Sequence, residues 1–135
     1  MKLEKIYEKI YEQIYEEVDH QLIKLRSNIS DLFDITHNEI EDDLQSESLF
    51  AINIRITKLY DDSMDLLMII SEKILIDTKD KLVLSGANVY ELMNIYFEIK
   101  KYINSFVRDS ILKIDRNVNL LYFNILKYID TYALN

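Results

Sequence analysis

The chain contains no cysteine, no proline and a single glycine, Gly86. Without cysteine it has no disulfide framework, no thiolate nucleophile and no cysteine-based metal site. Without proline, and with one glycine, it lacks a glycine-rich phosphate-binding loop and almost all glycine-dependent tight turns. His20 and His37 are its only histidines, which nearly excludes histidine-dependent triads and histidine-rich metal centres. These absences predict a non-enzymatic protein without a cofactor.

The chain has 135 residues, which is enough for one domain, and we expect that domain to span residues 1–135. The longest apolar run, Leu66–Ile70, is far shorter than the ~20 residues of a membrane span. The first residues lack the apolar region of a signal peptide. We therefore expect a cytoplasmic protein of a bacterial, archaeal or infected host cell, with no membrane partner. Its abundant Ile, Tyr, Asn and Lys hint at an AT-rich genome, such as that of a virus or mobile element.

Apolar residues recur at helical spacing along nearly the whole chain, mostly in steps of three and four, and no segment shows the sustained apolar–polar alternation of a strand. The three series are Leu3, Tyr7, Ile10, Ile14, Val18, Leu22, Leu25, Ile29 and Leu32, then Leu49, Ile52, Ile56, Leu59, Leu66, Ile70 and Ile74, then Leu92, Tyr96, Ile99, Ile103, Phe106, Ile114, Val118, Leu121, Ile125 and Ile129. This periodicity predicts an all-α protein.

Two polar segments are the clearest helix ends. In Ser85–Asn88 the glycine can end one helix in the left-handed conformation, and Asn88 can cap the next, with Glu91 as its capping-box partner. The other break is Asp42–Ser48. With these two breaks alone, the chain forms an elongated antiparallel bundle of three long helices, about 60 Å long. Weaker polar clusters at 27–31, 61–63 and 115–117 leave open a compact bundle of four to six shorter helices, although the lack of proline favours the long version.

A tetrapeptide repeat, Ile6-Tyr7-Glu8, Ile10-Tyr11-Glu12 and Ile14-Tyr15-Glu16, marks the start of the chain. A period of four overshoots the helical turn, so each copy is rotated by about 40° and the Ile and Tyr side chains together cover about half of the helix circumference. Two interpretations follow. The tyrosines can face the core with their hydroxyls at its rim, or part of the row can be exposed as a partner-binding or self-association surface.

Negative charge is concentrated in the first half of the chain. Residues 1–65 hold 16 acids and 7 bases, whereas residues 66–135 hold 8 acids and 9 bases. No Lys or Arg lies between Arg26 and Arg55, a stretch that contains Asp31, Asp34, Glu39, Glu41, Asp42, Asp43 and Glu47. Such a cluster can attract a basic partner protein and argues against direct nucleic-acid binding, which needs Lys and Arg. It can also be a solvated face that keeps the protein soluble.

Two carboxylate–histidine pairs, Glu17–His20 and Asp34–His37, have the i, i+3 spacing that di-iron bundles use. On one straight helix the two histidines are about 25 Å apart, which is too far to share a metal. We therefore expect no metal site, and a metal-binding bundle ranks as a distant third hypothesis.

The leading hypothesis is a small acidic protein–protein interaction module. Tyr7, Tyr11, Tyr15 and the seven clustered acids are its candidate partner-binding residues. The most concrete form is an inhibitor or regulator that docks a basic surface of a nucleic-acid-handling protein, as a viral anti-defence protein, an immunity protein or an antitoxin would. The alternative is a self-assembling structural subunit of a virion or scaffold, in which long apolar stripes join the chains into a homo-oligomer.

Overall fold

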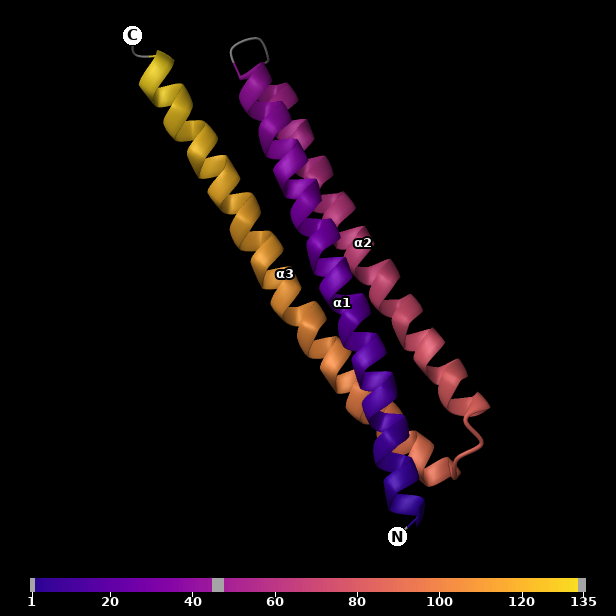
Figure 1. The fold of residues 1–135 in the computed structure, drawn as a ribbon. Helices are drawn as coiled ribbons and strands as arrows, with labels where there is room; N and C mark the ends of the chain where they lie inside the picture. Colours follow the sequence, from indigo (N-terminus) through magenta and orange to yellow (C-terminus); the bar gives the residue numbers. More distant parts are fainter. Residues whose placement is uncertain (1, 45–47, 134–135) are drawn as a thin grey trace.

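The structure is a computed structural model that describes residues 2–44 and 48–133, with side chains described for 8–42, 44 and 48–128. It consists of helices α1 (Lys2–Asp43), α2 (Leu49–Leu84) and α3 (Val89–Ala133). They pack lengthwise, with α2 antiparallel to α1 and α3 (Figure 1). No residue within the described ranges lies in a strand. The predicted bundle of three long helices is confirmed.

Local capping explains where the helices begin and end. At the start of α2, the Ser48 hydroxyl accepts the N–H of Ala51 at 3.2 Å. At its end, Gly86 has a φ of +71°, the left-handed conformation that glycine adopts without a Cβ clash. Asn88 Oδ1 then accepts the N–H of Tyr90 at 2.9 Å and begins α3. The two strong breaks, including the capping role of Asn88, are as predicted from the sequence.

The weaker polar clusters do not interrupt the helices. Residues 27–31 lie within α1, 61–63 within α2 and 115–117 within α3. The alternative of four to six shorter helices is therefore wrong. Ile29 lies buried within the first cluster and Ser63 within the second, while the buried Ile114 and Val118 flank the third. Tertiary burial therefore holds each helix through a segment of weak local propensity.

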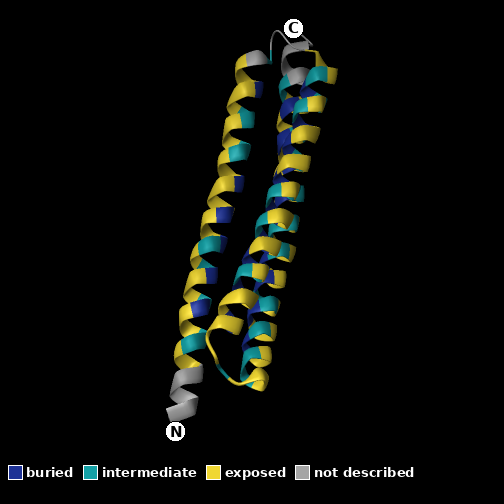
Figure 2. Cartoon of the chain, turned by 90° about the vertical axis from the view of Figure 1, so that its right-hand side faces the viewer, coloured by how far each residue is buried: buried dark blue, intermediate teal, exposed yellow. Residues whose placement is uncertain are grey.

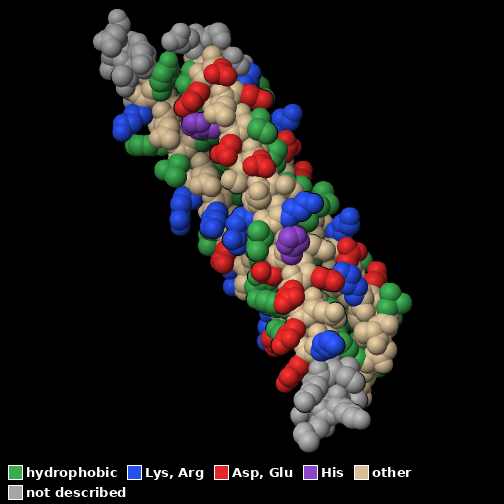
Figure 3. Space-filling model, in the orientation of Figure 1, with side chains coloured by type: hydrophobic (Ala, Val, Ile, Leu, Met, Phe, Trp, Pro, Cys, Tyr) green, Lys and Arg blue, Asp and Glu red, His purple; other side chains and the backbone are tan. Residues whose placement is uncertain are grey.

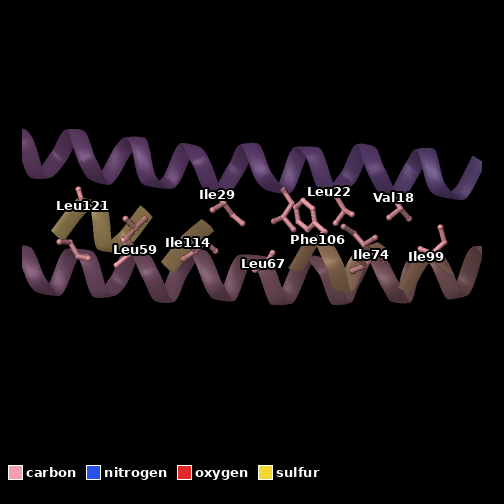
Figure 4. Close-up of a cluster of buried hydrophobic side chains, with 14 of the residues drawn as sticks. Val18, Leu22, Ile29, Leu59, Leu67, Ile74, Ile99, Phe106, Ile114 and Leu121 are labelled. Carbon is pink, nitrogen blue, oxygen red and sulfur yellow. The ribbon is translucent and has the colours of Figure 1, made fainter. Parts of the chain in front are cut away.

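Each helix contributes one row of side chains to a narrow core that runs along the bundle. Figure 2 shows the buried strip of each helix turned toward its neighbours, and Figure 4 shows ten labelled core side chains that converge between the helices. The buried hydrophobic residues are Ile14, Val18, Leu22, Leu25, Ile29 and Ile40 on α1, Ile52, Ile56, Leu59, Leu67, Ile74 and Leu82 on α2, and Ile95, Ile99, Ile103, Phe106, Ile114, Val118, Leu121 and Ile125 on α3.

The core row of α2 is more polar than apolar spacing predicts. Leu66 and Ile70, which belong to the predicted series, are only half-buried, while Ser63, Ser71 and Thr78 occupy buried positions. The Thr78 hydroxyl donates to the Ile74 carbonyl at 2.8 Å, and the Ser71 hydroxyl donates to the Met68 carbonyl at 3.2 Å. The prediction failed here because a search for apolar residues cannot recognise a core position that holds serine.

Ser63 is the one buried side chain whose polar atom has no hydrogen-bond partner among the described residues. Burying an unpaired hydroxyl costs about 1–3 kcal/mol. We expect Ser63→Ala to raise the free energy of unfolding by about 1 kcal/mol, measured by urea denaturation followed by circular dichroism. Ser71→Ala, which removes a bonded hydroxyl, is the matched control. A loss of stability in Ser63→Ala equal to that in the control would contradict the prediction.

The thin core leaves much apolar surface in contact with solvent. At least eighteen large hydrophobic residues are half exposed or more, on all three helices. Figure 3 shows hydrophobic side chains reaching the surface between intermingled acidic and basic ones. In the part of the chain that is described, no helix combines the length and apolarity needed to cross a bilayer.

Candidate functional site

The tyrosine row packs against α3 in the described part of the repeat. Tyr11 and Tyr15 are half-buried against the core. Their ring centroids are 6.0 Å apart, and the Tyr15 ring lies 4.8 Å from that of Tyr102 on α3. The Tyr7 side chain lies outside the described residues. Tyr11 and Tyr15 therefore contact the bundle with part of each ring, and the remaining part is exposed to solvent.

A hydrogen bond across the bundle extends this aromatic cluster. The Tyr102 hydroxyl donates to the Asp19 carboxylate on α1. That bond, together with burial and the nearby Tyr15 hydroxyl, raises the pKa of Tyr102 above its usual value because each of these favours the protonated phenol. Further along the seam between α1 and α3, the Arg26 guanidinium lies 5.3 Å from the centre of the Phe106 ring. The first half of the α1–α3 seam is therefore closed by aromatic and charge-assisted contacts.

We expect Tyr102→Phe to lower the free energy of unfolding by about 1 kcal/mol at neutral pH, because it removes a half-buried bond to a carboxylate. The folded-state pKa is raised, so this contribution is complete below the ordinary tyrosine pKa of about 10 and is lost as pH rises through the folded-state value. Urea denaturation of wild type and of Tyr102→Phe at a series of pH values measures this contribution to the free energy of unfolding. Tyr96→Phe, which keeps the ring contact with Phe97, is the control. No difference between wild type and Tyr102→Phe at neutral pH would contradict this assignment.

The two carboxylate–histidine pairs have other contacts in the bundle. The Glu17 carboxylate pairs with Lys81 of α2, and that of Asp19 accepts the bond from Tyr102. His37 Nε2 lies 3.6 Å from Glu41 Oε1, one turn further along α1. Among the residues that the structure describes, no three His, Cys, Asp or Glu side chains come together in a group that could hold a metal ion.

The clustered acids lie along the second half of α1. Asp31, Asp34, Glu39, Glu41 and Asp42 are all exposed, whereas the side chain of Asp43 and the residue Glu47 lie outside the described part. Figure 3 shows acidic side chains at this end of the molecule and again toward the opposite end. With 100° of rotation per residue, Asp31, Asp34, Glu41 and Asp42 share an arc of about 100° on the outer face of α1. We call these four residues the acidic stripe.

Glu39 lies apart from the acidic stripe. It lines a groove between α1 and α2 that also contains Arg55 and Lys58, so its charge faces basic side chains of the same chain. Asp34, at the edge of the stripe, lines the groove between α1 and α3 together with Arg26 and Lys113. Folding therefore places Glu39 and Asp34 in grooves that contain basic side chains, whereas Asp31, Glu41 and Asp42 line neither of these two grooves.

The end of α1 is electrostatically unfavourable for the helix itself. Its last turn contains acidic residues and no basic one, although the carboxyl end of a helix carries partial negative charge and is stabilised by cations. Local violations of this kind are typical of functional sites. Positive charge supplied from outside the chain would stabilise the carboxyl end of α1.

We expect Asp42→Asn to raise the free energy of unfolding by about 0.3–1 kcal/mol at low ionic strength, because it removes negative charge from the last turn of α1. Added salt should reduce the gain by screening. Asp31→Asn removes an equally exposed acid far from the helix end and should change stability much less. The comparison requires thermal or urea unfolding at low and high salt, and an equal gain in both variants would argue against the helix-dipole explanation.

Two larger grooves lie at the interhelical seams. The second half of the α1–α3 seam opens into a groove of about 450 Å³, with a floor that includes Ile29 and Ile114 and a rim that includes His37 and Lys113. A second groove, of about 580 Å³, lies beside the α2–α3 turn and is lined by Lys79, Leu82, Val83, Ala87, Val89, Leu92, Met93, Tyr96 and Phe97. Sequence reasoning missed this second surface, although apolar residues directly flank the turn at Gly86, where polar residues are usual.

The chain matches no known protein family, no curated protein and no solved structure in three comparisons. The functional argument therefore rests on the surfaces described above.

Proposed function

We propose that this protein is a non-enzymatic interaction module that docks a basic surface of another protein through the acidic stripe of α1. The observation that supports the proposal is the position of the stripe, which is exposed and runs into a helix end that its negative charge destabilises. A basic partner surface would supply the cations that α1 lacks in its last turn. It would also be attracted from a distance by a chain of net charge -8.

In its most concrete form, the module inhibits or regulates a nucleic-acid-handling protein. Such a protein binds phosphates through a positively charged groove, and a rigid helix bearing carboxylates can occupy the same groove. From Asp31 to Asp42 the stripe extends for about 16 Å along α1. Because buried residues from Ile14 to Ile40 anchor α1 in the bundle, the backbone that carries these carboxylates is held in place before binding, which reduces the entropic cost of association.

The test is an affinity capture from cells of the native host, using tagged protein in which the stripe has been neutralised. The variant carries Asp31→Asn, Asp34→Asn, Glu41→Gln and Asp42→Asn. Its matched control carries Asp61→Asn, Asp62→Asn, Asp65→Asn and Glu72→Gln, four exposed acids of α2. Both change the net charge by the same amount, so only the position of the neutralised groups differs. The captured partner is then purified and its affinity is measured for all three proteins.

We expect the stripe variant to bind the partner at least about tenfold more weakly at physiological ionic strength, while the control binds as wild type does. Binding by wild type should weaken strongly with added salt. Equal losses in both variants would mean that net charge, and not the stripe, attracts the partner. Unchanged binding by the stripe variant would overturn the proposal.

The alternative function is a self-assembling structural subunit, and the exposed apolar side chains on all three helices favour it. A head-to-tail contact that does not close would produce filaments or sheets. The two functions differ in how the mass of the species in solution depends on protein concentration. An interaction module forms a defined small species, whereas a structural subunit continues to grow as concentration rises.

A further inference from the structure

The end of the bundle opposite the acidic stripe carries an apolar groove. Beside the α2–α3 turn, the groove of about 580 Å³ is lined almost entirely by hydrophobic side chains. Around it, Val83 and Val89 are each 67% exposed and Tyr90 is 79% exposed, with Met93 and Phe97 half exposed. We call these five residues the tip patch. Soluble monomers rarely expose large contiguous apolar surfaces, and such patches mark interaction sites.

The tip patch contains both a projecting side chain and a recess. Tyr90, Met93 and Phe97 are spaced by three and four residues, so they lie on one face of α3. Met93 and Phe97 line the groove, and Tyr90 projects into solvent one turn before them. A surface with a projection and a recess side by side can be complementary to itself, which is the requirement for a two-fold symmetric contact.

The hairpin that carries the tip patch holds equal numbers of acidic and basic residues. Residues 72–105, which form the α2–α3 hairpin, contain five acidic and five basic residues. The hairpin is therefore neutral within a chain of net charge -8. Beside the hairpin, residues 8–20 of α1 contain five acids and one base, and two of these acids contact it, Glu17 at Lys81 and Asp19 at Tyr102. Two copies that meet at their hairpins bring together segments without net charge. A side-by-side dimer would instead juxtapose the acid-rich halves of α1.

The size of the patch is adequate for association. Five large side chains, each half exposed or more, present apolar surface on the order of several hundred Å², given that a large aromatic side chain alone covers about 150–250 Å². A standard interface buries about 800 Å² on each partner. The tip patch with its polar rim approaches that size, and aromatic residues such as Tyr90 are typical of the centre of such contacts.

We propose that two copies of this chain dimerise through the tip patch, with Tyr90 of each copy inserted beside Met93 and Phe97 of the other. The contact overlaps only residues 79–97, so the dimer is an extended rod of about 120 Å. The two acidic stripes lie at its outer ends, as far apart as the chain allows. This inference goes beyond the proposed function, because the dimer forms whether or not the stripes bind a basic partner, and it makes the module bivalent.

Single-cysteine crosslinking tests the dimer directly, since the natural chain has no cysteine. Asn94→Cys places one thiol beside the tip patch, one turn after Tyr90, and leaves the five tip-patch side chains in place. Phe123→Cys places one thiol at an exposed site on the distant half of α3. With a short bis-maleimide at low protein concentration, we expect a covalent dimer of about 32 kDa, twice the 16.2 kDa chain, from Asn94→Cys. Phe123→Cys should remain monomeric on a denaturing gel.

Sedimentation equilibrium of the cysteine-free protein supplies the second measurement. We expect wild type to behave as a dimer that persists in high salt, because its contact is apolar. Val83→Ser with Tyr90→Ser should raise the dimer Kd by at least about 100-fold. The matched control, Ile69→Ser with Phe123→Ser, replaces side chains that are 64% and 60% exposed and should leave the Kd unchanged. Circular dichroism verifies that both variants remain helical.

Several outcomes would overturn the proposal. They are a wild-type monomer at all concentrations, a dimer that the control substitutions weaken as much as the tip substitutions, and growth beyond the dimer. A monomer that cosediments with neutral phosphatidylcholine vesicles through Val83 and Tyr90 would assign the patch to a lipid surface instead. None of these results affects the acidic stripe, so failure of the dimer is distinguishable from failure of the proposed function.

Discussion

The burial of three narrow apolar rows along three long axes is the interaction on which the rest of the structure depends. Helices of 36 to 45 residues are held straight by this shared core, because tertiary burial contributes more to helix stability than local propensity does. The same geometry limits how much can be buried, since each helix of a three-helix rod faces its neighbours along one strip only. With 49% hydrophobic residues, the chain has more apolar side chains than the core can accept, and the remainder lies on the surface.

The α1–α3 seam illustrates how side-chain chemistry decides which parts of the bundle close. In its first half, Tyr15 packs on Tyr102 and Arg26 lies over Phe106, so the seam is filled by rings. In its second half, α3 presents Ser110, Asn117 and Asn124, whose polar groups would lose hydration without gaining partners if they were buried. The helices therefore meet through Ile29, Ile114 and their neighbours, and a groove remains above them.

The two ends of the rod differ in chemistry. At one end, the acidic stripe of α1 runs into a helix terminus whose last turn has no basic residue. At the other, a neutral hairpin exposes the apolar tip patch. Charge attracts a partner over a distance and fixes its orientation, whereas apolar contact supplies affinity only at close range. Because the acidic stripe and the tip patch lie at opposite ends of the rod, a partner bound at one surface would not obstruct the other.

The helical periodicity, the end of α2 at Gly86 and the capping of α3 by Asn88 could be predicted from the sequence. These features depend on residues within a few positions of one another, where spacing and intrinsic conformational preference are sufficient. The pairing of Tyr102 with Asp19, the burial of Ser63 and the exposure of Tyr90 could not be predicted, because each depends on how the helices are rotated and aligned against one another. The sequence by itself determined an all-α chain with two clear helix breaks and an acidic first half. Only the tertiary structure decided which acids face solvent and which apolar side chains are left without a neighbour, because only packing assigns each face of a helix to the core or to the surface.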